Sequence, residues 1–293
     1  MSRRCFVFGS SGFLGTILVS FLKNSGFEVF TIARSGKPDI QVEKICTSVV
    51  AEIVELYRPD FVINLAAATD VDKCEKDVAY AVSGNMEVVS AISDALIKLY
   101  QYDIQLIHIS TDQVYAGLGD HREDVVGPVN VYGLSKLAGE LSIKHPSTTI
   151  LRTNFVGKST AISRKSFTDW IVDSLASDKS ITLYSDVRFN PVHISSLCSM
   201  IVKLMDLRLF GTFNFAASSS LSKADFALKL AGLLNLKTDS VKIGRIATCP
   251  LVAKRPLDMT MSSNKLIAKI GGIAPNICDE IMKTANDYNY EKR

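Results

Sequence analysis

The segment Phe8–Gly15 has the sequence FGSSGFLG, in which two residues separate Gly9 from Gly12 and Gly12 from Gly15. The apolar run RCFVFG, which leads into this segment, has the length and composition of a buried parallel strand. The sequence GFLGTILVSFLKNSG, which begins inside it, has apolar side chains at helical spacing and ends at a glycine stop signal. The three glycines therefore stand in a turn that joins a strand to a helix.

Glycines in such a turn allow a tight bend, close approach of backbone N–H groups to a pyrophosphate, and close packing of the helix on the strand. The partial positive charge at the helix N-terminus also favours a phosphate group. A glycine triplet alone is a weak signal, but its position between a strand and a helix predicts a dinucleotide site. The predicted contacting residues are Gly9, Ser11, Gly12, Phe13, Leu14 and Gly15.

The first half of the chain continues to alternate strand and helix patterns. FEVFTIA, PDFVINLAAA, IQLIHIS and TTILRT are strand-like runs, whereas SVVAEIVELY, a stretch from about Val78 to Tyr100, and VYGLSKLAGELSIKH are helical. This alternation predicts an α/β fold with a doubly wound parallel sheet of the Rossmann type. Because 293 residues exceed one ordinary core, we expect a smaller second lobe. We expect residues 1–154 to form the dinucleotide-binding domain, to which some later segments return, and residues 155–293 mainly to form a substrate-binding lobe.

The composition argues against several classes of protein. Hydrophobic residues make up 47% of the chain and charged residues 22%, which is typical of a globular protein. The 33 basic and 30 acidic residues form no long basic run, so we expect no nucleic-acid partner. Six cysteines without Cys-x-x-Cys spacing favour reduced thiols and predict no structural metal site. No signal-peptide pattern and no stretch of about 18 apolar residues occurs, so we expect a cytoplasmic protein without a membrane span.

The end of the second predicted strand bears on the choice of cofactor. NAD-binding folds place an acidic residue there, on the ribose hydroxyl, whereas this chain has Ala33, Arg34 and Ser35. A guanidinium can pair with a 2'-phosphate through charge-assisted contacts. We therefore expect NADP(H) rather than NAD(H), with Arg34 as the phosphate ligand. The alternatives are that Arg34 is a solvated loop residue and that Asp39 supplies the missing acid.

Tyr132 and Lys136, in NVYGLSKLAGE, lie four residues apart in a predicted helix and so share one face, about 6 Å apart along the axis. Tyr288 and Lys292 have the same spacing near the C-terminus, so spacing alone decides little. However, Tyr132 follows the strand that ends in HISTDQVYAG, which places it at the carboxyl edge of the sheet, where ligands bind. A nearby ammonium would bring the tyrosine pKa down from about 10 toward the working range.

These motifs together resemble the extended short-chain dehydrogenase/reductase family. They are Gly-x-x-Gly-x-x-Gly, NLAA from Asn64, STD from Ser110 and Tyr-x-x-x-Lys, in the expected order. Within that family, NLAAATDVDKCE, HISTDQVYAG, VYGLSKLAGE, LRTNFVG and RPLDMTMSSNKL are most similar to dTDP-4-dehydrorhamnose reductases, over nearly the full length.

The resemblance implies NADPH-dependent reduction of a nucleotide-activated 4-keto-6-deoxy sugar, in the synthesis of a surface polysaccharide or a natural product. By this resemblance, Tyr132 would protonate the alkoxide, Lys136 would hold the nicotinamide ribose, and Thr111 would hydrogen-bond the ketone oxygen. Further cofactor contacts would come from Ala66, Ala67 and Thr69. Substrate contacts would come from Asp112, Asn154, Phe155 and Arg255.

Structural interpretations of several residues stay open. Thr111 can be a turn hydroxyl, Asp112 a cap and Asn85 an internal helix contact. A lone histidine such as His193 is more often structural than catalytic. Phe155 stands where the reductases typically have a tryptophan, and RFNPVHISSL differs from their Gly-x-Pro-Thr loop, so the sugar stays undefined.

Two other functions are compatible with the same motifs. The first is epimerisation or dehydration of a nucleotide sugar, although STDQVY has no glutamate next to Asp112 for a dehydratase acid–base pair. The second is a cofactor-binding regulatory subunit, because a regulatory subunit of methionine adenosyltransferase also resembles this family. A homodimer is possible, and we find no ligand cluster that predicts magnesium.

Overall fold

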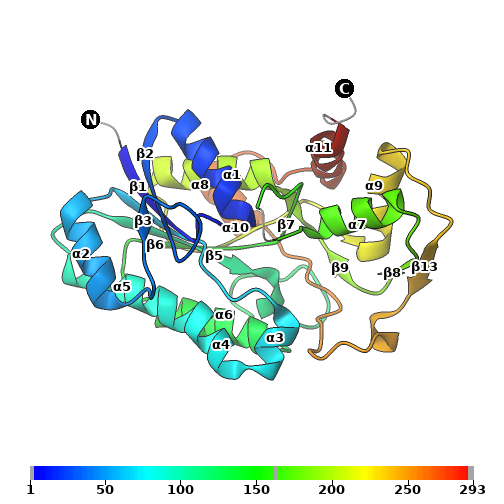
Figure 1. The fold of residues 1–293 in the computed structure, drawn as a ribbon, viewed down its shortest axis with the longest axis horizontal. Coiled ribbons are helices and arrows are strands. Elements are labelled where there is room, and N and C mark those ends of the chain that lie inside the picture. The colour runs from blue at the N-terminus through cyan, green and yellow to red at the C-terminus, as the bar shows by residue number, and fades with distance from the viewer. Residues whose placement is uncertain (1–2, 162–163, 290–293) are drawn as a thin grey trace. The chain divides into compact units, whose positions relative to one another are not determined.

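The computed structural model describes residues 3–161 and 164–289, whose fold is shown in Figure 1. They form two compact units. The first contains the described residues up to Thr111, together with Asn130–Arg152 and Cys198–Thr212. The second contains Asp112–Val129, Thr153–Leu197 and the described residues from Phe213 onward. The chain therefore passes between the units several times, and each unit is built from separate stretches of sequence.

A parallel sheet organises the first unit. Among the described residues seven strands follow in the spatial order β11-β6-β5-β4-β1-β2-β3. Their bounds are β1 (Arg3–Phe8), β2 (Phe27–Ala33), β3 (Ile40–Gln41), β4 (Phe61–Asn64), β5 (Gln105–Thr111), β6 (Thr148–Thr153) and β11 (Gly211–Phe215). β1 pairs in parallel with both β2 and β4, and β4 pairs in parallel with β5. The order reverses at β1, as in a doubly wound Rossmann sheet, which confirms the predicted fold class.

Helices cover both faces of this sheet. Figure 1 shows α1 (Phe13–Asn24) on one face, and α2 (Thr47–Tyr57), α5 (Val88–Lys98) and α6 (Val131–Ser142) on the other. Two short helices, α3 (Val71–Lys76) and α4 (Val78–Val82), follow β4. Apolar side chains of α2 and α5 pack on those of the strands, and burial of this apolar surface holds the layers together. This core includes Phe6, Phe8, Ile32, Val50, Val54, Val62, Ile92, Leu96 and Leu106.

The helical pattern predicted from Val78 to Tyr100 forms, but it contains a π-helical segment. This segment, η1 (Ser83–Glu87), lies between α4 and α5. A Cβ on Gly84 would come within 2.6 Å of the Ala68 side chain, so the absence of a side chain allows close approach of the loop after β4. The π segment thereby brings Asn85 to that loop.

The second unit combines small sheets with helices. β7 (Phe155–Val156) pairs with β10 (Val192–His193), β9 (Arg188–Phe189) with β12 (Leu221–Ser222), and β8 (Ile181–Tyr184) with β13 (Val241–Gly244). Its helices are α7 (Phe167–Ala176), α9 (Lys223–Leu233), α10 (Asn264–Ile270) and α11 (Ile277–Asn289). Two short 3-10 turns, η2 (Asp112–Val114) and η3 (Ile246–Thr248), also belong to it. Helix α8 (Ile194–Leu207) starts in this unit and ends in the first. Phe189, Phe226 and Ile281 contribute to its core.

Candidate active site

The glycine turn after β1 requires the residues that its sequence provides. Gly9 has a φ of 79°, and a Cβ there would come within 2.6 Å of the Ala66 backbone N. A Cβ on Gly15 would collide with the carbonyl oxygens of Gly9 and Ser10. Gly12 is the N-cap of α1, without a side-chain cap and without an acidic residue in the first turn. The turn therefore fits a pyrophosphate, because backbone can approach it closely and no carboxylate competes at this helix end.

The loop after β2 leaves basic side chains at the surface. Arg34 and Lys37 are exposed, and a Cβ on Gly36 would lie 3.9 Å from the Ser11 Cβ of the glycine turn. The Asp39 carboxylate accepts hydrogen bonds from Thr31 N at 2.9 Å and Thr31 Oγ1 at 2.8 Å. The hydrogen bond from the Thr31 backbone is the main reason that the pKa of Asp39 lies below its usual range. Asp39 thus closes the loop, and its carboxylate is already engaged there.

Two asparagines hold the loop that follows β4. The Asn64 Oδ1 accepts from Ala66 N at 3.1 Å, and the Asn85 Oδ1 accepts from Ala68 N at 2.8 Å. Asn85 Nδ2 also donates to Ala68 O at 3.0 Å and to Ser135 Oγ in α6 at 2.9 Å. Ala66, Ala67 and Thr69 belong to this held loop. Asn85 therefore has the internal polar contact that the sequence left open, and this contact reaches the helix of Tyr132.

Helix α6 begins at a well-capped end. Asn130 Oδ1 accepts from Gly133 N at 2.8 Å, and the Glu75 carboxylate accepts from Val131 N at 2.9 Å. These caps satisfy N–H groups that a helix N-terminus otherwise leaves without partners. They fix the first turn, which carries Tyr132. The Tyr132 side chain is 8% exposed and packs among Ala68, Cys74 and Ala81.

Lys136 is tied to the strand that carries Thr111. Its Nζ donates to Ile109 O in β5 at 2.8 Å, and the residue is only 2% exposed. Burial lowers the pKa of Lys136 to about 8, while the Glu140 carboxylate acts in the opposite direction. β5 ends two residues later at Thr111, which is also buried. The first unit therefore brings Lys136 and the strand of Thr111 together, with Tyr132 one turn away on the same helix face.

A buried ionic cluster lies behind these residues. Arg152 Nε contacts the Glu140 carboxylate oxygens at 3.1 and 3.0 Å, and Arg152 Nη2 contacts Oε2 at 2.6 Å. Ser110 Oγ donates to the same carboxylate. The buried, bidentate pair fixes α6 to β6, and the hydrogen bond from Ser110 fixes the same carboxylate to β5. This cluster was not among the predicted features, although a charged residue inside the apolar strand TTILRT is a detectable signal.

His108 of β5 completes the polar groups near Lys136. Its Nδ1 lies 3.1 Å from Asn64 Nδ2, which donates to it, so the ring proton is on Nε2. Nε2 is buried without a hydrogen-bond partner among the described residues. Burial, and then the Lys136 charge, lower the pKa of His108 well below its usual value. The ring is therefore neutral and adds no positive charge beside the Lys136 ammonium.

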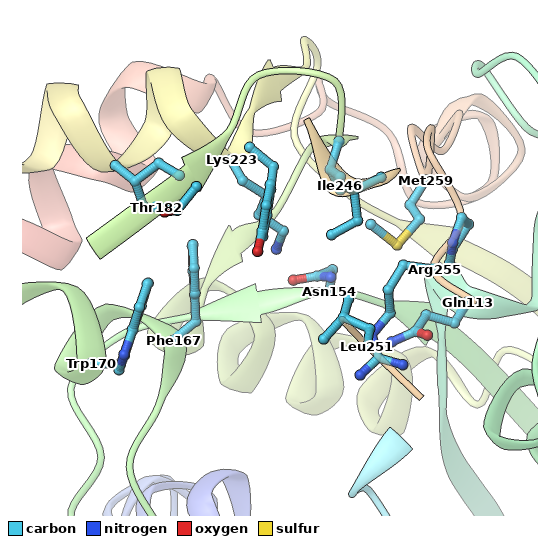
Figure 2. Close-up of a pocket in the computed structure, with 14 residues that line it drawn as sticks. Gln113, Asn154, Phe167, Trp170, Thr182, Lys223, Ile246, Leu251, Arg255 and Met259 are labelled. Atoms are coloured by element: carbon cyan, nitrogen blue, oxygen red, sulfur yellow. The ribbon is translucent and has the colours of Figure 1, made fainter. Parts of the chain in front are cut away.

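A cavity of about 320 Å³ lies within the second unit (Figure 2). Its wall contains two cationic side chains, Lys223 and Arg255, and no carboxylate. The ring of Phe167 stacks on that of Trp170, with centroids 6.1 Å apart. The lining residues are Gln113, Asn154, Phe167, Trp170, Thr182, Leu183, Tyr184, Val187, Lys223, Ile246, Leu251, Arg255, Pro256 and Met259. An apolar pocket with aromatic faces and two cations suits a ligand with a flat ring and an anionic group.

The predicted substrate residues lie differently around this cavity. Asn154 and Arg255 both line it. Asp112 does not line it, but its Oδ2 accepts from Asn154 Nδ2 at 2.5 Å. Phe155 lies in β7, where it pairs with Val192, and it is not a lining residue. The structure thus brings together two of the four residues and connects a third through Asn154.

Lys223, which was not among the predicted site residues, is the first residue of α9. Its Nζ lies 3.5 Å from the ring centroid of Phe189 and 4.5 Å from that of Phe167. Burial lowers the pKa of Lys223 to about 8, and the Asp112 charge acts in the opposite direction. A cation in the first turn of a helix opposes the helix dipole. That unfavourable placement in SLSKADFALKLAGLL was the available signal.

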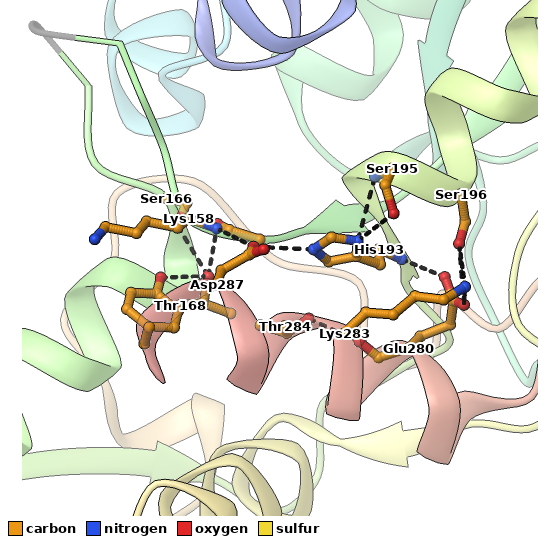
Figure 3. A network of polar contacts seen from close by, with 12 residues as sticks. Lys158, Ser166, Thr168, His193, Ser195, Ser196, Glu280, Lys283, Thr284 and Asp287 are labelled. Carbon is orange, nitrogen blue, oxygen red and sulfur yellow. Dashed lines mark hydrogen bonds and ion pairs between the residues drawn. The ribbon is translucent and has the colours of Figure 1, made fainter. Parts of the chain in front are cut away.

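His193 belongs to a separate polar network, shown in Figure 3. Its Nε2 lies 2.9 Å from Asp287 Oδ2 and its Nδ1 lies 2.7 Å from Ser195 Oγ. Its backbone N donates to Glu280 Oε2 at 2.5 Å. These contacts join β10 and the start of α8 to α11, which is a structural role.

The comparison pair Tyr288–Lys292 is described only at its tyrosine, since Lys292 lies outside the described residues. The Tyr288 hydroxyl donates to Asp169 Oδ1 at 2.6 Å. Burial, followed by this hydrogen bond, raises the pKa of Tyr288. A tyrosine that acts as a general acid or base near neutral pH needs a lowered pKa, so the raised pKa argues against such a role for Tyr288.

Residues 3–161 and 164–289 contain no group of three or more His, Cys, Asp or Glu side chains that could hold a metal ion. Within the same ranges, none of the helices has the length and apolar character needed to cross a membrane.

The chain is similar to known proteins in both sequence and fold. The family model described as RmlD substrate binding domain matches residues 3–289. The chain is 29% identical over 290 residues to a probable low-salt glycan biosynthesis reductase, Agl14, of Haloferax volcanii, covering 94% of this chain and 95% of that protein. It is 26% identical over 302 residues to a dTDP-4-dehydrorhamnose reductase of Aggregatibacter actinomycetemcomitans, covering 97% and 99%. The crystal structure of dTDP-4-dehydrorhamnose reductase from Bacillus anthracis in complex with NADP matches with a TM-score of 0.86 at 25% identity, covering 97% and 99%.

Proposed function

The chain belongs to the RmlD substrate binding domain family of extended short-chain dehydrogenase/reductases, which are NAD(P)-dependent oxidoreductases, and on this premise we propose that it reduces a nucleotide-activated 4-keto-6-deoxy sugar with NADPH. The observation that carries the proposal is the contact of Lys136 Nζ with Ile109 O. It joins the tyrosine–lysine helix to the strand that ends at Thr111. The names of the relatives, a glycan biosynthesis reductase and a dehydrorhamnose reductase, support this class of substrate.

The proposed chemistry assigns one task to each of three side chains. The hydride for the ketone carbon comes from the bound reduced nicotinamide. Tyr132 donates its phenolic proton to the oxygen of the former ketone, so that a secondary alcohol forms, and later regains a proton from solvent. The Lys136 ammonium stabilises the tyrosinate left behind and binds the nicotinamide ribose. Thr111 donates a hydrogen bond to the ketone oxygen and orients it for the transfer.

For the cofactor we propose NADP(H), with Arg34 pairing with the 2'-phosphate. Two observations support the choice: Arg34 is exposed at the end of β2, and the Asp39 carboxylate is engaged by Thr31. The uncapped N-terminus of α1 at Gly12 offers backbone N–H groups to the pyrophosphate. The loop of Ala66, Ala67 and Thr69 would form the next part of the same site. The similar Bacillus anthracis reductase is in complex with NADP.

For the substrate we propose the cavity lined by Asn154 and Arg255 as the nucleotide site. Its aromatic wall suits a base, and Arg255 suits a phosphate. Asp112 would act through Asn154, whose amide it orients. We propose Phe155 only as a more distant apolar contact, because it does not line the cavity.

The decisive test is oxidation of NADPH in the presence of a panel of dTDP- and UDP-linked 4-keto-6-deoxy sugars, with analysis of the product. Net oxidation with one new hydroxyl group per NADPH is the expected result. Tyr132→Phe should lower kcat by about a hundredfold or more because it removes the proton donor. Turnover of a nucleotide sugar without net NADPH consumption would instead identify an epimerase or dehydratase. Inactivity on the whole panel, together with co-purification of a catalytic partner, would identify a regulatory subunit.

A further inference from the structure

The charge lining the second-unit cavity is unbalanced. Lys223 and Arg255 both line it, and none of its lining residues is acidic. The aromatic side chains of the lining are Phe167, Trp170 and Tyr184. Figure 2 shows Lys223 and Asn154 facing the same hollow, with Arg255 beside it. Two cations in a largely apolar wall disfavour an empty cavity and favour an anionic ligand.

The Lys223 ammonium lies against aromatic side chains. Its Nζ lies 3.5 Å from the ring centroid of Phe189 and 4.5 Å from that of Phe167. Asp112 is the acidic group whose charge acts on it, and that carboxylate also accepts a hydrogen bond from Asn154. Cation–π contacts compensate only part of the cost of burying an ammonium. An anion in the cavity would supply the rest.

Building on the proposed function, we infer that Lys223 binds the diphosphate of the substrate's nucleotide together with Arg255, and that it makes this cavity select nucleoside diphosphates over nucleosides. In a nucleoside diphosphate the diphosphate is attached directly to the nucleoside. The aromatic side chains of the cavity therefore suit the base, and its two cations suit the diphosphate next to it. Arg255 supplies a planar fork of donors, whereas Lys223 supplies a compact charge that can follow the second phosphate. Lys223 would thus be a specificity-determining residue of the second unit.

Direct binding measurements without NADPH test the inference. Calorimetry at pH 7 compares dTDP with thymidine, and UDP with uridine, on the full chain and its variants. The wild-type protein should bind at least one diphosphate more tightly than its nucleoside. Lys223→Gln should weaken that diphosphate by about tenfold to a hundredfold and the nucleoside by less than about threefold, because only the diphosphate loses a charge-assisted contact. Lys223→Arg should keep most of the diphosphate affinity.

Matched controls separate this role from a structural one. Lys229→Gln removes an exposed lysine from the same helix and should leave both affinities unchanged. Lys223→Met keeps a long side chain against Phe189 without the charge, so it should repeat the loss seen with glutamine even if glutamine perturbs the fold. Thermal unfolding of each variant reports folding independently.

Several outcomes would overturn the inference. Equal loss of diphosphate and nucleoside binding would show that Lys223 only supports the cavity. Wild-type affinity for diphosphate in folded Lys223→Gln and Lys223→Met would show that it makes no contact, and failure of the wild-type protein to prefer either diphosphate would remove the premise. The proposed reductase activity fails separately, since binding needs no turnover. Tyr132→Phe should keep the diphosphate affinity, and absence of turnover on the sugar panel would leave the Lys223 measurements interpretable.

Discussion

Asn85 Nδ2 lies 2.9 Å from Ser135 Oγ, the residue next to Lys136, and the same amide group also donates to Ala68 O. One buried side chain in the π-helical segment thus connects the loop after β4 to the helix of Tyr132 and Lys136. Replacement of Asn85 by alanine leaves the buried Ala68 N–H without this acceptor. We expect Asn85→Ala to reduce the free energy of unfolding by about 1–3 kcal/mol.

The same substitution should weaken NADPH binding, because the loop of Ala66, Ala67 and Thr69 loses its anchor. Urea unfolding and fluorescence titration with NADPH measure the two effects. Asn24→Ala, at an exposed position in the last turn of α1, is the control and should change neither quantity. Full NADPH affinity in Asn85→Ala would argue that the anchor has no part in cofactor binding.

Substitution of alanine should have opposite effects at two glycines, one in the turn after β1 and one in α9. Gly15→Ala should abolish measurable NADPH binding, since its Cβ would collide with the backbone oxygens of Gly9 and Ser10. Gly232→Ala in α9 meets no atom within 4 Å and should raise stability by roughly 0.5–1 kcal/mol, because alanine has the higher helix propensity. Circular dichroism and NADPH titration distinguish the two variants. If Gly15→Ala binds NADPH normally, the assignment of this turn to the pyrophosphate is wrong.

Arg34 predicts a change in cofactor selectivity. Arg34→Ala should raise the KM for NADPH by about tenfold or more and leave the KM for NADH nearly unchanged, because only NADPH carries the 2'-phosphate. Lys44→Ala, another exposed basic residue in the same region of the chain, should alter neither constant. A clear preference of the wild-type enzyme for NADH would refute the role of Arg34.

Burial of Lys136 predicts how stability depends on pH. In the folded protein the pKa of Lys136 is about 8, below its usual value of 10.5, mainly because of burial. Between these values the unfolded chain binds the proton and the folded chain does not, so the free energy of unfolding rises with pH in this window. Lys223 contributes in the same direction. Lys136→Met should therefore show a smaller rise between pH 7.5 and 9.5 in urea unfolding and should lose reductase activity.

Lys223 predicts how nucleotide binding depends on pH. The charge of Asp112 acts on Lys223, and Arg255 and Tyr184 line the same cavity. The pKa of Tyr184 is raised to about 12, chiefly by its hydrogen bond with Cys249, and Asp186 acts in the same direction. Because Lys223 loses its proton near pH 8, the affinity for dTDP should fall between pH 7 and 9.5. Lys223→Arg should bind with little change over this range, since its guanidinium stays charged. An equal decline in both proteins would assign the effect to another group.

Local patterns were enough to predict the framework of the first unit. The apolar runs from RCFVFG to TTILRT appear as the strands of one parallel sheet, because buried strands and amphipathic helices each leave a short-range signature. The strand-to-helix position of Gly9, Gly12 and Gly15 followed in the same way. Long-range contacts could not be predicted in this way. Asp39 could equally have faced a ribose until its contact with Thr31 was seen, and nothing near Gly84 in the sequence specifies a π-helical segment that packs on Ala68.

The sheet, its glycine turn and the order of Thr111, Tyr132 and Lys136 along the chain could be predicted from local patterns, since each depends on residues that are neighbours in sequence. Which distant side chains share a cavity became apparent only in the folded chain. Gln113, Lys223 and Met259 line the same cavity although more than a hundred positions separate the first from the others. These side chains meet because separate segments of the second unit pack together. Contacts of this kind leave no periodic pattern in the sequence.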